Sequence, residues 1–342
     1  MRFSMVLTAA SLILAAVLGF AAHRASICTV KAVAEVLTTR RAHMVASFAK
    51  TILWILAVTV PMVWLLPAVD GAGQAWPLTA ASAAGGYLFG VGAALNGGCA
   101  FSTLSKLCDG RLSMLLTLIG FTLGMAGHAL LVRSSVIVPP TALPATTYLP
   151  GPWSLAALAI VELWVMWEAV RLLRTRPAGR PLGRLVLADR YRLSSAAALL
   201  GLSNGVLFAL HGTWTYTTAI DSGVDQLLLA GPGPGDLKWA LFAALLAGML
   251  VSSWQRGSFR LDWGPSARWI VHLLAGGLMG LGAALAPGGN EALLLNGIPG
   301  LSPHAVPALL TVLAGIATVL VAGRWVGTAR LEVRCTGDVC GD

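Results

Sequence analysis

The feature that most constrains this chain is a series of nine long apolar segments, each about 18–23 residues long. An α-helix of about 20 apolar residues crosses the hydrocarbon layer of a bilayer, which is ~30 Å thick. The sequence therefore predicts an all-α integral membrane protein with about nine transmembrane helices. We place these helices at residues 3–22, 45–66, 78–96, 112–132, 152–173, 195–211, 237–253, 269–286 and 305–323.

The composition supports a place in the lipid bilayer and excludes several classes of soluble protein. Only 11% of the 342 residues are charged, and the mean hydropathy is +0.79. Soluble domains carry about 25% charged residues. These values exclude a soluble globular enzyme, a disordered tail and a nucleic-acid-binding protein. The net charge of +9 is best explained by basic loops on one side of a membrane.

Basic residues occur in every second loop, which predicts the orientation of the chain. The loops at 67–77, 134–151, 212–236 and 287–304 contain no Lys or Arg, and the first of them holds Asp70. The other loops and the tail contain basic residues, among them Lys31, Lys106, Arg111, Arg171, Arg174, Arg176, Arg180, Arg184, Arg190, Arg192, Arg256, Arg260, Arg268, Arg324, Arg330 and Arg334. Because basic loops stay in the cytoplasm, we expect the N-terminus outside and the C-terminus inside.

A glycine pattern recurs after about 190 residues and predicts an inverted repeat. The sequence GVGAAL at 90–95 matches GLGAAL at 280–285, and a Gly-Gly pair follows each. The first of these spans is expected to run inward and the second outward. Glycine and alanine also recur in packed membrane helices without any repeat. Inverted repeats are typical of transporters, whose site lies between the repeats. The expected parts are a first repeat at 1–133, a connector at 134–192, a second repeat at 193–324 and a tail at 325–342.

Four short segments are expected to form broken or re-entrant helices. Two follow the Gly-Gly pairs, at 99–107 and 290–295, and two follow the first span of each half, at 26–33 and 211–218. Irregular backbone is tolerated near a membrane only where protein buries it or water reaches it. The N-terminus of a short helix carries a partial positive charge that suits an anion. The segments are therefore either ordinary interfacial loops or the walls of an anion pathway.

Two cysteines stand at the openings of these short segments. Cys28 and Cys99 are either small core residues or soft, weakly donating contacts for an anion with an exposed sulfur atom. Asn290 follows the second Gly-Gly pair as Cys99 follows the first, and His211 falls near the place of Cys28 in the inverted half. The candidate pathway residues are Cys28, Cys99, Asn290, His211, Gly97, Gly98, Gly288 and Gly289.

The remaining cysteines indicate no disulfide scaffold, metal centre or cofactor site. Cys108 is expected to be structural. Cys335 and Cys340 form a C-x4-C pair in the tail, which could pass on sulfur, bind a metal weakly or have no role. The sequence contains no P-loop, so ATP hydrolysis by this chain is not expected. We expect neither a catalytic residue nor a cofactor.

The Cys28 segment, the Gly-Gly-Cys99 break, the inverted halves and the nine spans resemble the YeeE/YedE sulfur-transport family. The resemblance implies uptake of thiosulfate across a bacterial inner membrane, through a narrow pathway marked by three cysteines on short helices. Cys28 and Cys99 match the two cysteines of the first half, and Asn290 takes the place of the third. A small cytoplasmic sulfur carrier protein is an implied partner.

Three functions stay open from the residues. The chain is expected to be an importer of a small sulfur-containing anion, with thiosulfate first and other sulfur or selenium compounds as alternatives. It could instead be a membrane enzyme that transfers sulfur through Cys28 and Cys99. The absence of the third cysteine also allows a non-transporting subunit or sensor.

Overall fold

The structure is a computed structural model that describes residues 2–66, 75–143, 148, 150–175, 188–264, 267–326, 334–336 and 338–341. Part of the charge pattern used above lies outside these described residues. The residues concerned are Asp70, Arg176, Arg180, Arg184 and Arg330.

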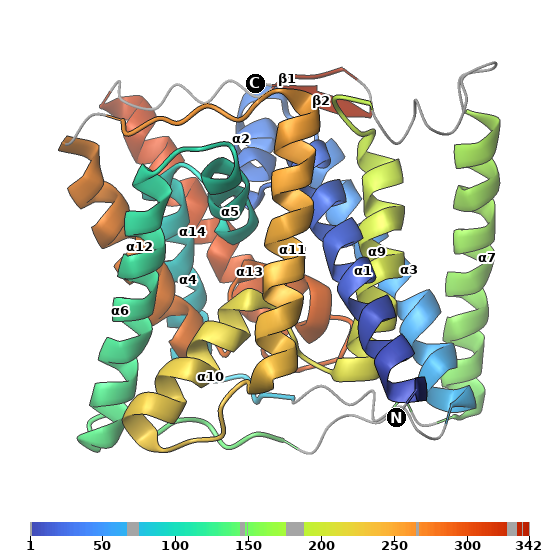
Figure 1. Ribbon diagram of the computed structural model, residues 1–342, viewed down its shortest axis with the longest axis horizontal. Coiled ribbons are helices and arrows are strands. Elements are labelled where there is room, and N and C mark those ends of the chain that lie inside the picture. The colour runs from blue at the N-terminus through green and yellow to red at the C-terminus, as the bar shows by residue number, and fades with distance from the viewer. Residues whose placement is uncertain are drawn as a thin grey trace.

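Long helices build most of the described chain and confirm the predicted fold class. They stand side by side, and the two termini lie at opposite ends of the bundle (Figure 1). Eight of the described helices, some counted with the short helix that follows, are long and apolar enough to cross a membrane. A further helix, α7, is 23 residues long but carries Glu162 and Glu168. The long helices are α1 (Arg2–Ala25), α3 (His43–Leu65), α4 (Ala80–Asn96), α6 (Ser113–Arg133), α7 (Pro152–Arg174), α9 (Leu193–His211), α11 (Gly235–Arg256), α12 (Ala267–Leu285) and α14 (Ala305–Trp325).

Short helices follow the four predicted breaks. Each begins within the bundle, and α5 and α13 lie near its centre in Figure 1. The four are α2 (Thr29–Thr39), α5 (Ala100–Cys108), α10 (Tyr216–Leu229) and α13 (Asn290–Ala292), and α13 continues as the π-helical turn η1 (Leu293–Gly297). One element was not expected. Strands β1 (Arg334–Thr336) and β2 (Val339–Gly341) form an antiparallel hairpin in the tail, with Cys335 opposite Cys340 in the register.

Helix contacts come in matched pairs. Helix α1 packs on α11 as α9 packs on α3, and α6 packs on α12 as α14 packs on α4. Likewise α2 contacts α14 and α10 contacts α6. If each helix of the series α1–α6 is replaced by the helix at the same position in the series α9–α14, and the reverse, each of these contacts becomes its matching contact. We infer that the two halves are inverted repeats, with α4 against α12 and α1 against α9 at the axis.

Helix α7 lies outside this pairing. It packs on α3 and stands at the edge of the bundle in Figure 1. Its buried Glu168 accepts a hydrogen bond from Lys50 of α3 at 2.7 Å and another from Arg171 at 3.0 Å. If α7 moved away from α3, Glu168 would lose its contact with Lys50. A buried charge without its partner is costly, so this ion pair holds α7 against α3.

The repeated glycines are explained by the closest helix crossings. A Cβ atom on Gly90 would lie 2.1 Å from the carbonyl oxygen of Val312 in α14. A Cβ atom on Gly280 would lie 1.9 Å from the carbonyl oxygen of Phe121 in α6. Both distances are far below contact distance. The repeated glycines therefore lie at two equivalent crossings, α4 on α14 and α12 on α6. Only glycine allows these helices to approach so closely.

We expect Gly280→Ala to destabilise the protein, because α12 and α6 must move apart to admit the new methyl group. Overpacking of this kind costs about 2 kcal/mol, which corresponds to a melting temperature lower by about 5 °C. Thermal unfolding in detergent, followed by size-exclusion chromatography, measures the effect. Gly127→Ala in α6 is the matched control, since no atom lies within 4 Å of its added Cβ. Equal melting temperatures for the two variants would contradict the proposed crossing.

Candidate functional site

The first break is held by the side chain of Asn96, the last residue of α4. Its amide nitrogen donates to the carbonyl oxygen of Gly98 at 3.2 Å and to the hydroxyl of Thr103 at 2.9 Å. Its amide oxygen accepts from Thr117 of α6 and from the imidazole of His272 of α12, each at 2.8 Å. Between α4 and α5, Gly97 has a φ of +71°, a conformation that glycine adopts without strain. These contacts place Cys99 at the start of α5.

The second break has an equivalent brace from another helix. Asn204 of α9 donates from its amide to the carbonyl oxygen of Leu295 at 2.8 Å and accepts from the indole of Trp214 at 3.1 Å. Gly288 has a φ of +138°. A Cβ atom on Gly289 would lie 3.1 Å from Cγ2 of Thr217 in α10, so the break also packs closely against that helix. Both predicted Gly-Gly pairs therefore form tight junctions inside the bundle.

The residues at which α5 and α13 begin align the two halves of the chain differently from the sequence pattern. The N-cap residues of α5 and α13 are Cys99 and Gly289, so Asn290 corresponds to Ala100 and not to Cys99. The difference arises because Pro287 occupies the position of Gly97, which shifts the second Gly-Gly pair by one residue.

The same comparison changes the counterpart of Cys28. The N-cap residues of α2 and α10 are Cys28 and Thr215. Thr215, and not His211, therefore holds the place of Cys28 in the second half. The imidazole Nε2 of His211 lies 2.8 Å from the hydroxyl of Ser11 in α1. His211 does not line any of the three cavities described below.

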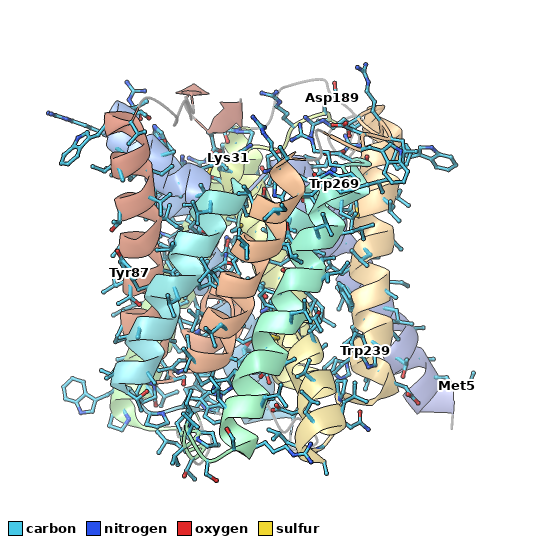
Figure 2. All side chains as sticks on the ribbon, turned by 90° about the vertical axis from the view of Figure 1, so that its left-hand side faces the viewer. Met5, Lys31, Tyr87, Asp189, Trp239 and Trp269 are labelled. Atoms are coloured by element: carbon cyan, nitrogen blue, oxygen red, sulfur yellow. The ribbon has the colours of Figure 1, made fainter. Side chains whose placement is uncertain are left out.

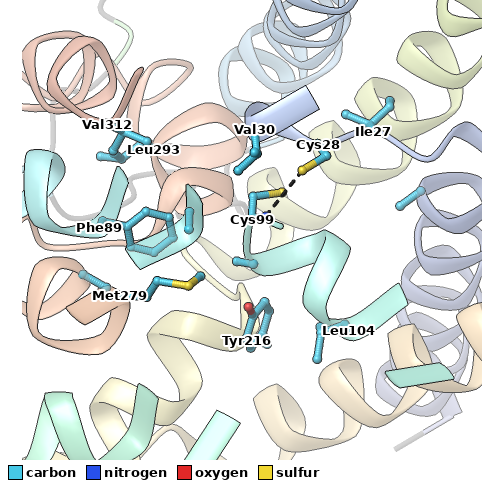
Figure 3. Close-up of a cluster of buried hydrophobic side chains, with 14 of the residues drawn as sticks. Ile27, Cys28, Val30, Phe89, Cys99, Leu104, Tyr216, Met279, Leu293 and Val312 are labelled. Atoms are coloured by element: carbon cyan, nitrogen blue, oxygen red, sulfur yellow. Dashed lines mark hydrogen bonds between the residues drawn. The ribbon is translucent and has the colours of Figure 1, made fainter. Parts of the chain in front are cut away.

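Three of the predicted residues meet at the centre of the bundle. The backbone N–H of Cys99 donates to the sulfur atom of Cys28 at 3.4 Å (Figure 3). The backbone N–H of Ala100 donates to the amide oxygen of Asn290, also at 3.4 Å. Cys28, Cys99 and Asn290 are each no more than 2% exposed. They belong to three separate short helices, so the junction exists only in the folded protein.

The starts of all four short helices face this junction. Tyr216, the first residue of α10, lies beside Cys99 in Figure 3, and Thr217 lies against Gly289. Gly289 has no side chain, and none of the other three N-cap side chains accepts a hydrogen bond from a backbone amide of its own helix. Apart from the N–H of Ala100, which donates to Asn290, the amides of these first turns have no side-chain cap, and the positive ends of the helix dipoles point to one place.

A middle cavity of about 30 Å³ lies at the junction. Its polar lining comes from Cys28, Thr29, Thr51, Cys99, Asn290 and Glu291. Apolar side chains complete the wall, among them Ile27, Phe48, Phe101, Leu200, Leu294 and Leu295. A volume of this size holds about one or two water molecules. The junction is therefore a constriction between larger spaces.

An inner cavity of about 280 Å³ opens on the basic side of the constriction. Lys31, Lys106, Arg111 and Arg256 line it, and Figure 2 shows Lys31 toward the end of the bundle opposite Met5. The Lys106 ammonium group donates to the carbonyl oxygen of Gly97 at 2.7 Å, which ties this charge to the first break.

Asp109 marks the rim of the inner cavity, where three helices meet. Its carboxylate accepts hydrogen bonds from His23, Ser253 and Ser258. Burial by itself raises the pKa of Asp109, but the hydrogen bonds and the nearby His23 together outweigh this effect, so the pKa lies below its ordinary value. The carboxylate is therefore held in its charged form as a link between α1, α11 and the end of α5.

An outer cavity of about 110 Å³ lies on the other side of the constriction. Its lining includes Thr217, Asp221, Lys238, Asn296 and His304. Asn296 lies in the π-helical turn η1, a distortion that often occurs at functional sites. The outer and middle cavities are lined by adjacent residues of α13 and η1, and the middle and inner cavities share Ile27, so the three cavities are neighbours.

Sequence reasoning missed four polar residues that line the middle and outer cavities. Nine buried side-chain nitrogen or oxygen atoms in the described residues have no hydrogen-bond partner, and six of them belong to Thr29, Glu291, Asn296 and His304. Each of these residues lines the middle or the outer cavity. Unpaired buried polar atoms are rare and call for an explanation. The sequence held one signal, since Glu291 is an acidic residue beside an apolar run.

The chain is similar to known proteins over most of its length. The model of a family described as sulphur transport matches residues 24–318, which include both breaks and nearly all of the residues that line the three cavities. The thiosulfate transporter TsuA of Escherichia coli (strain K12) is 24% identical over 330 residues, with 84% of this chain and 85% of TsuA covered.

Proposed function

Because the chain belongs to the sulphur-transport family, we propose that it imports thiosulfate, or a closely similar sulfur-containing anion, across a bacterial inner membrane. The observation that carries this proposal is the meeting of Cys28, Cys99 and Asn290 at a constriction between two polar cavities. The likeness to TsuA, a thiosulfate transporter, supports thiosulfate as the substrate. The protein is a carrier in this proposal and not an enzyme.

The chemistry of the junction suits an anion that has both sulfur and oxygen on its surface. Thiol groups are soft and weakly donating, and they contact the terminal sulfur atom of thiosulfate. The amide of Asn290 and the backbone N–H groups of the first helical turns donate to its oxygen atoms. No Lys or Arg lines the middle cavity. The anion is therefore attracted by dipoles and released again, because no fixed positive charge holds it.

The size of the middle cavity requires movement during transport. About 30 Å³ is too small for thiosulfate, so the structure corresponds to a closed pathway. The short helices α5 and α13 contact each other across the constriction. A small separation of these two helices opens a continuous route from the outer to the inner cavity.

The orientation follows from the charges around the route. The inner cavity carries Lys31, Lys106, Arg111 and Arg256, and it faces the cytoplasm in our proposal. The N-terminus then lies outside, and the C-terminal hairpin lies inside. The basic cavity offers a place for a small cytoplasmic sulfur carrier protein to take up the product.

An inside-negative potential opposes the entry of this anion. Moving two negative charges inward costs roughly 4.6 kcal/mol at 100 mV, from ~2.3 kcal/mol per charge. Consumption of thiosulfate in the cytoplasm or a coupled cation must supply this energy.

Uptake of radiolabelled thiosulfate into proteoliposomes tests the proposal. We expect accumulation above protein-free liposomes. Unlabelled sulfate should compete at least about tenfold more weakly than thiosulfate, because an oxygen atom replaces the sulfur that the thiols contact. Folded protein that takes up no thiosulfate would exclude this substrate, and selenosulfate would be examined next. Label retained covalently on Cys99, seen by mass spectrometry, would favour the sulfur-transfer enzyme.

A further inference from the structure

Glu291 is a carboxyl group buried at the centre of the bundle. It lies in α13 next to Asn290, lines the middle cavity with Cys28 and Cys99, and is 1% exposed. Neither carboxyl oxygen has a hydrogen-bond partner, and no ion pair joins it to a described residue. Thr217 of α10 faces the carboxyl group without a hydrogen bond of normal geometry. None of the contacts proposed for the anion involves this carboxyl group.

The groups around Glu291 supply no compensating positive charge. The first-half helices α2 and α5 present the thiols of Cys28 and Cys99. Helices α3 and α9 present only uncharged side chains to the middle cavity. The remaining titratable groups lie on α10, on α11 and before α14, namely Tyr216 beside the junction and Asp221, Lys238 and His304 around the outer cavity. Lys238 forms no ion pair with Glu291.

A carboxyl group in such a place favours its neutral form. Burying an unpaired carboxylate is costly, whereas the protonated acid carries no charge. A metal cation is a poorer occupant, because it requires several oxygen ligands and the described residues contain no group of three or more His, Cys, Asp or Glu side chains suited to one. Intramembrane acids of this kind commonly act as proton carriers in transporters.

The outer cavity offers a route for the proton. Two residues that line this cavity lie close to Glu291 in the chain. They are Ala292 of α13 and Gly288, which precedes that helix. Asn296 and His304, which also line it, have unpaired polar atoms that can hold water. Asp221 lines the same cavity. Water held by these groups would connect the outer side with the segment that carries the carboxyl group.

We propose that Glu291 binds the proton that enters together with the anion, and so couples thiosulfate import to the proton gradient. This inference rests on the proposed import. The protonated acid is a neutral neighbour that can donate a hydrogen bond to an anion at Cys28, Cys99 and Asn290. The carboxylate repels the anion from the same place. Each anion therefore passes with one proton, which then leaves from Glu291 to the cytoplasmic side.

Thiosulfate uptake under an imposed pH gradient tests this coupling. The membrane potential is clamped at zero with valinomycin and equal potassium, and uptake is compared with acid outside and without a gradient. We expect acid outside to raise the initial rate of the wild-type protein at least about fivefold. For Glu291→Gln the ratio of the two rates should fall to about 1, whatever the residual rate. Glu162→Gln in α7 is the matched control and should keep the wild-type ratio.

Two further measurements keep the result interpretable. Glu291→Asp should recover part of the stimulation, because it retains a titratable carboxyl group. A pH-sensitive dye inside wild-type liposomes should report acidification when thiosulfate is added outside. Thiosulfate counterflow without any gradient is measured first, and its absence would remove the proposed function itself. Three results would overturn the proton site alone and leave the proposed import intact. They are counterflow without stimulation by a pH gradient, stimulation that persists in Glu291→Gln, and stimulation by a sodium gradient instead of a pH gradient.

Discussion

Replacing Cys99 with serine is expected to lower the initial rate of thiosulfate uptake at least about tenfold, equivalent to ~1.4 kcal/mol. Two effects act in the same direction. The soft contact to the terminal sulfur atom is lost. Serine is also a preferred N-cap residue, so its hydroxyl will accept from the first-turn amides of α5, which Cys99 leaves uncapped. Those amides are then unavailable to the anion.

The second effect gives this prediction a separate readout. Capping α5 should leave the melting temperature of Cys99→Ser equal to or above that of the wild-type protein. A loss of transport without a loss of stability is therefore expected. Cys108→Ser is the matched control, because Cys108 is a buried free cysteine at the end of the same helix and lines none of the three cavities. Undiminished uptake by Cys99→Ser, or an equal loss in Cys108→Ser, would contradict a pathway role.

Asn96→Leu is expected to abolish uptake and to destabilise the protein by about 3 kcal/mol. The substitution removes four hydrogen bonds at once, to Gly98, Thr103, Thr117 and His272. It leaves their buried polar atoms without partners. The first break then loses the contacts that fix α5 against α4 and α6, so Cys99 no longer faces Cys28.

Thermal unfolding and uptake of this variant should be measured together. Thr122→Val on α6 is the control, because its exposed hydroxyl only donates to Leu118 of its own helix. The control should melt and transport like the wild-type protein. If Asn96→Leu melts at the wild-type temperature and transports thiosulfate, the brace at the first break does not position the junction.

Much of the candidate site could be predicted from local sequence. Cys28, Cys99 and the Gly-Gly pairs each lie at an interruption of an apolar run, which is a signal that the sequence alone provides. The structure brings Cys28, Cys99 and Asn290 together, and it places His211 on Ser11 instead. The predicted register of the second half is wrong by one residue, because Pro287 takes the position of Gly97 and moves the second Gly-Gly pair along the chain.

Other members of the site had no distinctive local pattern. Asn96 and Asn204 look like isolated amides in apolar helices, and their role depends on partners that lie up to 176 and 91 residues away in the chain. Glu291 looks like an acidic loop residue. Only the folded bundle reveals that it is 1% exposed, unpaired and next to the cysteines.

The sequence by itself determined the membrane-spanning helices, the places where they break and the glycines at their crossings. Each of these depends on the residues of one segment and on the absence of water in the bilayer, which forces every backbone group to find a partner nearby. Tertiary structure alone decided which breaks meet. Cys28, Cys99 and Asn290 come from three short helices whose side chains converge only when α4 packs on α12 and α1 packs on α9. Such contacts join residues that are distant in the chain, so no local pattern encodes them.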